Sequence, residues 1–213
     1  VKVNAIANHE RNNRETIHNL EEDHNTMPTT PSQRDTDIRI ASELSESIEA
    51  NSDFFVLTGS YSIDALTGAD VKHNDIDANI FTKDLPMALG RIAALLQART
   101  DDMRLTKRTN TRLEYLRSHR YGSTQVEMQF VQYDDLKQNA DSFDFILPHK
   151  ANHERVVPIV RAGLRETDGH EHSFFVKSLP FAIGTWALRI SGIALDQKRE
   201  VRESDIRHFA FLA

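Results

Sequence analysis

The sequence predicts an α+β protein, with a short, mixed, mostly antiparallel sheet flanked by helices and followed by C-terminal helices. Three patterns indicate this fold class. Apolar residues recur at helical spacing over residues 36–50 and 85–100. They alternate with polar residues over 124–132, which is typical of a half-buried strand. The dipeptide Asp168-Gly169, a favoured hairpin turn, separates two further strand-like runs.

The composition is that of an acidic chain without cysteine. Its 213 residues include 26 Lys and Arg against 32 Asp and Glu, and the formal net charge of −6 argues against a general nucleic-acid-binding surface. The absence of cysteine excludes disulfides, thiolate zinc sites and a cysteine nucleophile. No apolar run approaches the roughly 20 residues that a membrane-spanning helix needs. We therefore expect a soluble, cytoplasmic protein without a membrane partner.

The chain is expected to have three parts. Residues 1–35 are polar and end in a segment rich in Pro, Thr and Ser. We interpret them as an arm that lies on the domain or on a partner subunit, which leaves a homodimer open, and a loosely ordered tail is the alternative. Residues 36–178 are expected to form the main domain, beginning with a helix over 36–50 that Asp37 could cap. Residues 179–213 are expected to form a helical segment packed on that domain.

The central stretch, residues 54–81, follows the pattern strand, tight turn, short helix, loop, strand. An apolar run over 54–57 stops at Gly59-Ser60, and a short amphipathic segment follows it. After a loop, Asp75-Ile76-Asp77 opens a second run in which apolar and polar residues alternate. This compact pattern makes residues 54–81 the best-defined part of the chain.

Elements after this stretch are less regular. The run 143–147 fits either a strand or the start of a helix. Residues 155–166 and 171–178 flank the hairpin turn and are expected to pair with each other. Pro158 lacks a backbone N–H, and we therefore expect its strand to lie at an edge of the sheet.

Carboxylates and a glycine-serine turn give the central stretch a specific chemistry. Side chains alternate along a strand, so Asp75 and Asp77 share one face. Two neighbouring carboxylates repel each other unless a cation lies between them, and Mg²⁺ prefers such oxygen ligands while leaving positions open for phosphate oxygens. Gly59 allows a close backbone approach, and Ser60 adds a hydroxyl at a helix N-terminus. The residues therefore predict a phosphate cradle opposite a metal-binding acidic pair.

The same stretch resembles the nucleotidyltransferase superfamily of the polymerase-beta type, most closely the aminoglycoside and lincosamide nucleotidyltransferases. Fourteen residues separate Ser60 from Asp75, as the family pattern requires. The resemblance covers about residues 38–135, and it covers the C-terminal third only in outline. The matching blocks are Gly59-Ser60, Ile63-Asp64-Ala65-Leu66 with Gly68, and His73-Asn74-Asp75-Ile76-Asp77.

The resemblance implies a nucleotidyltransferase fold and a set of site residues. The superfamily carries a third carboxylate on a later strand, and Glu127 is the acidic residue of 124–132, on its polar face. Asp75, Asp77 and Glu127 would then be catalytic and hold two Mg²⁺ ions, although Glu127 could simply face solvent. Gly59 and Ser60 would bind the β- and γ-phosphates. His73 would touch a phosphate or a ligating carboxylate, or else merely order its loop.

The activity implied is transfer of a nucleoside monophosphate from a nucleoside triphosphate, with ATP expected, to a hydroxyl acceptor. The acidic net charge favours a small-molecule acceptor, such as an antibiotic, over nucleic acid. A toxin-like or housekeeping nucleotidyltransferase acting on RNA or protein is the first alternative. A non-catalytic nucleotide-binding or regulatory module with the same fold is the second, and the retained acids argue against it.

Other polar clusters give weaker indications. The pairs His149/His153 and His170/His172 could bind zinc, and whether the histidines bind metal is left open. A basic cluster could contact a triphosphate or an anionic acceptor, or it could be a solvated hairpin rim, and the same holds for Lys83. This basic cluster consists of Arg104, Lys107, Arg108 and Arg112.

Overall fold

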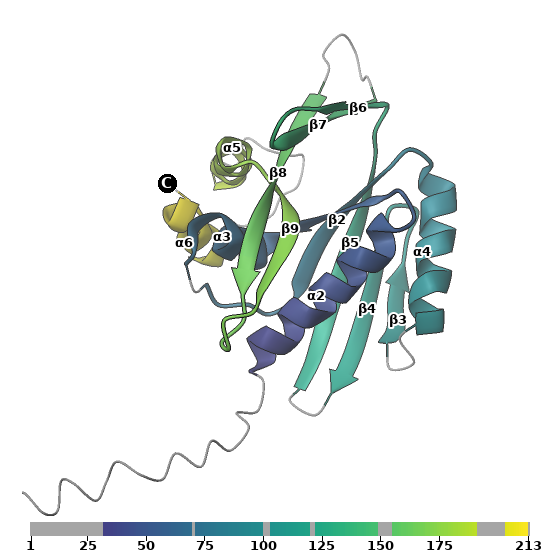
Figure 1. The fold of residues 1–213 in the computed structure, drawn as a ribbon, viewed down its shortest axis with the longest axis horizontal. Helices are drawn as coiled ribbons and strands as arrows, with labels where there is room; N and C mark the ends of the chain where they lie inside the picture. The colour runs from purple at the N-terminus through teal and green to yellow at the C-terminus, as the bar shows by residue number, and fades with distance from the viewer. Residues whose placement is uncertain are drawn as a thin grey trace, which may run out of the picture. The chain divides into compact units, whose positions relative to one another are not determined.

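The computed structural model describes residues 32–69, 71–99, 103–119, 122–148, 155–190 and 203–212. Within these ranges the chain forms one nine-stranded mixed sheet and five helices (Figure 1). The strands are β1 (Phe54–Thr58), β2 (Ile76–Thr82), β3 (Met103–Arg108), β4 (Arg112–His119), β5 (Gly122–Gln132), β6 (Asp135–Gln138), β7 (Ser142–Leu147), β8 (Arg155–Arg165) and β9 (Glu171–Lys177). The helices are α2 (Gln33–Glu49), α3 (Gly59–Thr67), α4 (Leu85–Arg99), α5 (Leu179–Ile190) and α6 (Glu203–Leu212).

The strands lie in the order β3-β4-β5-β2-β1-β9-β8-β7-β6. The α+β class is as predicted, but the expected short, mostly antiparallel sheet needs two corrections. The sheet has nine strands, and two of the pairs at its centre, β2–β5 and β1–β9, are parallel. Parallel pairs join segments that are distant in sequence, so no local turn pattern predicts them.

Two smaller expectations about strands are also resolved. Residues 143–147, which fitted either a strand or a helix, lie in strand β7. The predicted edge position of Pro158 is wrong, because β8 lies between β7 and β9. Pro158 lacks a donor, but its carbonyl oxygen accepts a hydrogen bond from the Ser178 N–H at 2.9 Å. Proline thus removes one donor from this internal strand without excluding the strand from the sheet.

The alternation of side chains gives the sheet two different faces. One face, here called the α2/α4 face, packs against the apolar sides of helices α2 and α4. Its central strand residues are Phe55, Leu57, Ile76, Ala78 and Ile80. The opposite face, here called the aromatic face, is built on Phe54, Phe81, Tyr133, Phe145 and Phe175. The polar residues that lie between the apolar residues of the α2/α4 face along a strand therefore project from the aromatic face.

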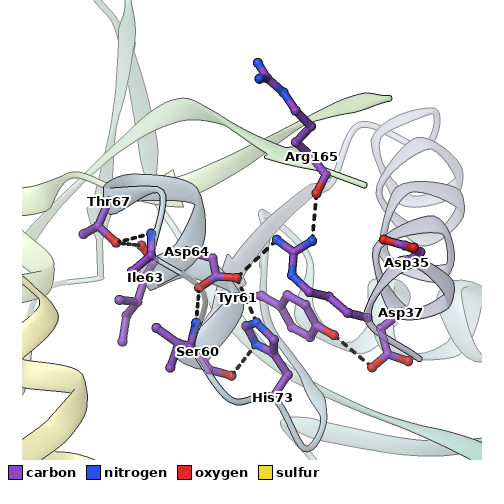
Figure 2. Close-up of polar contacts among 12 residues, drawn as sticks. Asp35, Asp37, Ser60, Tyr61, Ile63, Asp64, Thr67, His73 and Arg165 are labelled. Carbon is purple, nitrogen blue, oxygen red and sulfur yellow. Dashed lines mark hydrogen bonds and ion pairs between the residues drawn. The ribbon is translucent and has the colours of Figure 1, made fainter. Parts of the chain in front are cut away.

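Helix α2 begins with a capping box. The Ser32 hydroxyl accepts from the Asp35 N–H at 3.1 Å, and the Ser32 N–H donates to the Asp35 carboxylate at 3.4 Å. The prediction that Asp37 caps this helix is wrong, because Asp37 lies inside α2 and is buried. Its carboxylate instead accepts a hydrogen bond from Tyr61 (Figure 2).

The C-terminal helices pack with α3 through a small apolar cluster. Ile63 from α3, Ala182 from α5 and Leu212 from α6 are buried there together with Val71. None of the helices in the described ranges is long and apolar enough to cross a bilayer.

Candidate functional site

Two adjacent strands bring two of the three predicted acids to one row of the sheet. Asp77 on β2 is the register partner of Thr58 on β1 and of Glu127 on β5. Paired residues on neighbouring strands project from the same face at a spacing of about 4.8 Å. Asp77 and Glu127 therefore lie side by side on the aromatic face. Asp75 is half-buried in the bend that precedes β2, two residues before Asp77.

Gly59 is required by the turn that joins β1 to α3. Its φ of +66° lies in the left-handed region, where side chains are rarely tolerated. A Cβ atom at this position would also lie 2.4 Å from Oδ2 of Asp77. The Asp77 carboxylate therefore occupies the space that any other side chain at position 59 would need, and it lies at the N-terminal end of α3.

His73 bridges two residues of α3. Its Nδ1 atom lies 3.0 Å from the Ser60 hydroxyl, and its Nε2 atom lies 2.8 Å from Oδ2 of Asp64 (Figure 2). The His73 ring stacks on the Tyr61 ring, with centroids 3.7 Å apart and planes 7° apart. His73 thus fixes the loop before β2 against the start of α3, next to the turn that contains Gly59.

Asp64 belongs to the family-like block, but its role was not predicted. The Asp64 side chain is buried, and it accepts from the Val71 N–H at 2.8 Å and from Arg34 at 3.3 Å in addition to His73. Arg34 also donates to the backbone oxygen of Arg165 at 2.7 Å, so one carboxylate links α3, α2 and the end of β8 (Figure 2). The sequence feature that could have indicated this role is an acidic residue inside an otherwise apolar helical segment.

Asp37 is a second buried acid beside this group. Its carboxylate accepts from the Tyr61 hydroxyl at 2.9 Å, from Gln33 at 2.7 Å and from Thr124 on β5. Burial, together with the nearby charge of Asp37, raises the pKa of Tyr61 far above its usual range. Tyr61 is therefore a permanent hydrogen-bond donor that joins α3 to α2.

Glu127 has a protein counter-ion. Arg112 on β4 forms an ion pair with Glu127, and its Nε atom lies 3.1 Å from Oε1 of Glu114. Glu114 is the register partner of Glu127 and also pairs with Lys107 at 3.3 Å. Two members of the predicted basic cluster thus neutralise adjacent acids on the sheet.

These acids fit Mg²⁺ in chemistry and partly in position. All three predicted ligands offer the hard oxygen donors that the ion prefers, and Asp77 and Glu127 are in register. Glu127 is held by Arg112, however, and within the described ranges no three or more His, Asp or Glu side chains already form a group that could hold an ion. An ion bound at Glu127 would compete with Arg112 for this carboxylate.

The other histidine pairs give no metal site among the residues that the structure describes. His149 and His153 lie outside those residues. Nε2 of His172 lies 2.6 Å from the buried carboxylate of Glu166, which also accepts from Nε of Arg39 at 2.7 Å. The hydrogen bond from Arg39, joined by that from His172, outweighs burial and lowers the pKa of Glu166. This group ties the β8–β9 hairpin to α2.

No protein-family model and no curated protein sequence matches the chain. Among solved structures, the chain is similar to an antigenic nucleotidyltransferase-like protein from Paracoccidioides brasiliensis, with 15% identity over 86% of this chain and 78% of that chain and a TM-score of 0.52. A match to the antibiotic-resistance factor ANT(2'')-Ia has 14% identity, 83% coverage of each chain and a TM-score of 0.45. A match to a putative nucleotidyltransferase from Thermotoga maritima has 15% identity over 78% of this chain and 91% of that chain, and a TM-score of 0.39.

The first of these similarities defines the class of fold. The chain has a nucleotidyltransferase-like fold, as its central motif predicted. The turn at Gly59 and Asp77 on β2 lie at the centre of the nine-stranded sheet of this chain.

Proposed function

We propose that the protein is a metal-dependent nucleotidyltransferase that moves a nucleoside monophosphate from a nucleoside triphosphate, with ATP as the expected donor, to a hydroxyl acceptor. The observation that carries the proposal is the position of Asp77. Its carboxylate contacts the Gly59 turn, and Asp77 is the register partner of Glu127. A metal-binding acid and a phosphate-binding turn have to be neighbours if one nucleotide is to engage both.

On the donor side, Asp75 and Asp77 would hold Mg²⁺, and Glu127 would join a second ion after releasing Arg112. When bound, the ions would neutralise phosphate charge and lower the pKa of the acceptor hydroxyl. The backbone at Gly59 and the hydroxyl of Ser60 would bind the β- and γ-phosphates at the start of α3. His73, held by Asp64, would keep Ser60 in position.

The chemical step is a displacement at the α-phosphorus. The acceptor oxygen forms a bond to that phosphorus, and the bond to the bridging oxygen breaks, so that pyrophosphate leaves with the electron pair. Glu127 would either complete the second metal site or act as the base that accepts the hydroxyl proton. Positioning and charge neutralisation would supply most of the rate enhancement.

On the acceptor side, we propose a small molecule with a hydroxyl group rather than nucleic acid. The net charge is −6, and two basic side chains near the acids, Arg112 and Lys107, are paired with Glu114 and Glu127. These pairs leave less free positive charge for a polyanionic acceptor. A cytoplasmic location and a homodimer stay predictions.

The proposal is tested by incubating the protein with Mg²⁺ and each of the four ribonucleoside triphosphates labelled at the α-phosphorus, together with pooled hydroxyl compounds, tRNA or protein. We expect label on a small molecule in the wild type, and a loss of at least ~100-fold in Asp77→Asn. Glu114→Gln, which alters a neighbouring acid outside the proposed ligands, should keep most of the activity. Label on tRNA or protein would favour the first alternative. No label on any acceptor, together with no Mg²⁺-dependent nucleotide binding, would favour a non-catalytic module.

A further inference from the structure

Lys177 lies on the same row of the sheet as the acids, on the other side of Asp77 from Glu127. It is the last residue of β9 and follows Val176, which is the parallel register partner of Leu57. The next position on β1 is Thr58, the register partner of Asp77. Lys177 lies two residues after Phe175 on the same strand, so both side chains project from the aromatic face, as that of Asp77 does.

The surroundings of Lys177 are apolar. Its Nζ atom lies 6.0 Å from the centroid of the Phe181 ring on α5, and its register partner on β8 is the buried residue Ile159. Across the described ranges, no ion pair or hydrogen bond links the ammonium group to another residue. Burial among these side chains lowers the pKa of Lys177. A partly desolvated cation without a counter-ion destabilises the fold, which indicates a role in binding an anion.

Other cations near this row differ from Lys177. Arg112 and Lys107 are paired with acids, and Arg161 on β8 pairs with Glu49 at 3.0 Å. Lys83 also lies over an aromatic ring of the same face, 5.8 Å from the Tyr133 centroid, but Lys83 is exposed to solvent. Lys177 thus combines partial burial, position beside the acids and the lack of a counter-ion within the described part of the chain.

The row has one cation on one side and acids on the other, which matches the charges of a metal–triphosphate complex. The metal needs carboxylates, whereas the phosphate oxygens need a cationic or N–H donor. Lys177 and Asp77 are two strands apart, roughly 10 Å between their backbones, which a lysine side chain and a triphosphate together can span. Thr58, between them, does not cap α3 with its side chain, so its hydroxyl is a further candidate donor.

We propose that Lys177 binds the β- and γ-phosphates of the donor nucleotide and lies opposite the metal-binding acids across the triphosphate. This assignment rests on the proposed function for the identity of the nucleotide. The chemical class that it requires is a polyphosphate, with or without a nucleoside.

The test is calorimetric titration of the full chain with inorganic tripolyphosphate and, separately, with Mg²⁺-ATP. We expect Lys177→Met, which keeps most of the length of the side chain and removes the charge, to weaken tripolyphosphate binding about tenfold or more. Lys177→Arg should restore most of the affinity, and the matched control Lys83→Met should stay within about twofold of the wild type. Thermal unfolding should show that Lys177→Met is folded and at least as stable as the wild type, because it removes an uncompensated charge.

The proposal is overturned if Lys177→Met binds tripolyphosphate as tightly as the wild type does, or if the wild type does not bind tripolyphosphate. Failure of the proposed function is a separate result. Tripolyphosphate binding that depends on Lys177, in a protein that transfers no nucleotide, would support the anion site and reject the enzyme. Nucleotide transfer that does not change in Lys177→Met would support the enzyme and reject the anion site at Lys177.

Discussion

The carboxylate of Asp77 lies directly against the backbone of Gly59. A Cβ atom at position 59 would lie 2.4 Å from Oδ2 and 3.1 Å from Cβ of Asp77, and Gly59 has a φ of +66°. The turn between β1 and α3 is therefore open only to glycine, both because of its own conformation and because of the acid on the next strand. The two residues form one structural unit at the centre of the sheet.

Gly59→Ala should destabilise the protein and abolish nucleotide transfer. We expect a loss of about 2–4 kcal/mol in the free energy of unfolding, from left-handed strain together with the clash with Asp77. Gly68→Ala is the matched control, since Gly68 has a φ of +70° but nothing within 4 Å of the added Cβ. It should cost only about 1–2 kcal/mol. Urea denaturation measures both variants, and equal losses would mean that the contact with Asp77 is unimportant.

Two buried tyrosines should respond differently to loss of their hydroxyl groups. Tyr61 donates to the buried carboxylate of Asp37, so Tyr61→Phe should cost about 1–3 kcal/mol of stability. The buried Tyr115 hydroxyl has no hydrogen-bond partner in the described part of the chain, and burial raises the pKa of Tyr115 to about 12. Tyr115→Phe should therefore be neutral or stabilising. If both variants lose the same stability, the contact between Tyr61 and Asp37 does not contribute as we infer.

Glu166 should make the stability of the protein depend on acidic pH. Because its pKa is lower in the folded state than its ordinary value of 4.5, its contribution is present above pH 4.5 and is lost as the pH falls through the folded-state value. Denaturation curves from pH 6 to pH 3 should show a smaller acid-dependent loss in Glu166→Gln than in the wild type. Glu171→Gln is the control on the same hairpin, where an exposed ion pair with Arg165 contributes little. If the stability of Glu166→Gln depends on pH as steeply as that of the wild type, Glu166 is not the source of this pH dependence.

Arg112 should compete with metal ions for Glu127. Arg112→Gln leaves Glu114 and Glu127 adjacent without their shared cation, so divalent ions should bind more tightly. Titration of the nucleotide-free protein with Mn²⁺, followed by electron paramagnetic resonance, measures this affinity directly. Arg104→Gln changes an exposed member of the same basic cluster and should have little effect. Weaker Mn²⁺ binding in Arg112→Gln would show that Arg112 supports the ion site rather than competing with it.

Local and long-range features of this site differ in how well the sequence predicts them. Gly59, Asp75 and Asp77 belong to one continuous strand, turn, helix, loop and strand, so periodicity and turn chemistry were sufficient to place them. The register of Glu127 with Asp77 depends on the parallel pair β2–β5, and only the family resemblance indicated that neighbour. The position of Lys177 depends on the pair β1–β9, which no local pattern encodes.

Buried polar partners were the least predictable part. Nothing in the spacing of Arg34 and Asp64 indicates that the two side chains meet, because they lie on different helices whose packing is set by the whole core. The same holds for Arg112, whose basic neighbours suggested a solvated rim although it pairs with Glu127. Such contacts follow from tertiary packing, which overrides local tendencies.

The most direct test of the central claim is a crystal structure of the full chain with Mg²⁺ and a non-hydrolysable triphosphate analogue. We predict an ion bound by Asp75 and Asp77, the β- and γ-phosphates at Gly59 and Ser60, and the Lys177 ammonium group on the far side of the triphosphate. A nucleotide bound away from the Gly59 turn, or a triphosphate without an ion at Asp77, would contradict the claim that this turn and this acid form a nucleotidyl-transfer site.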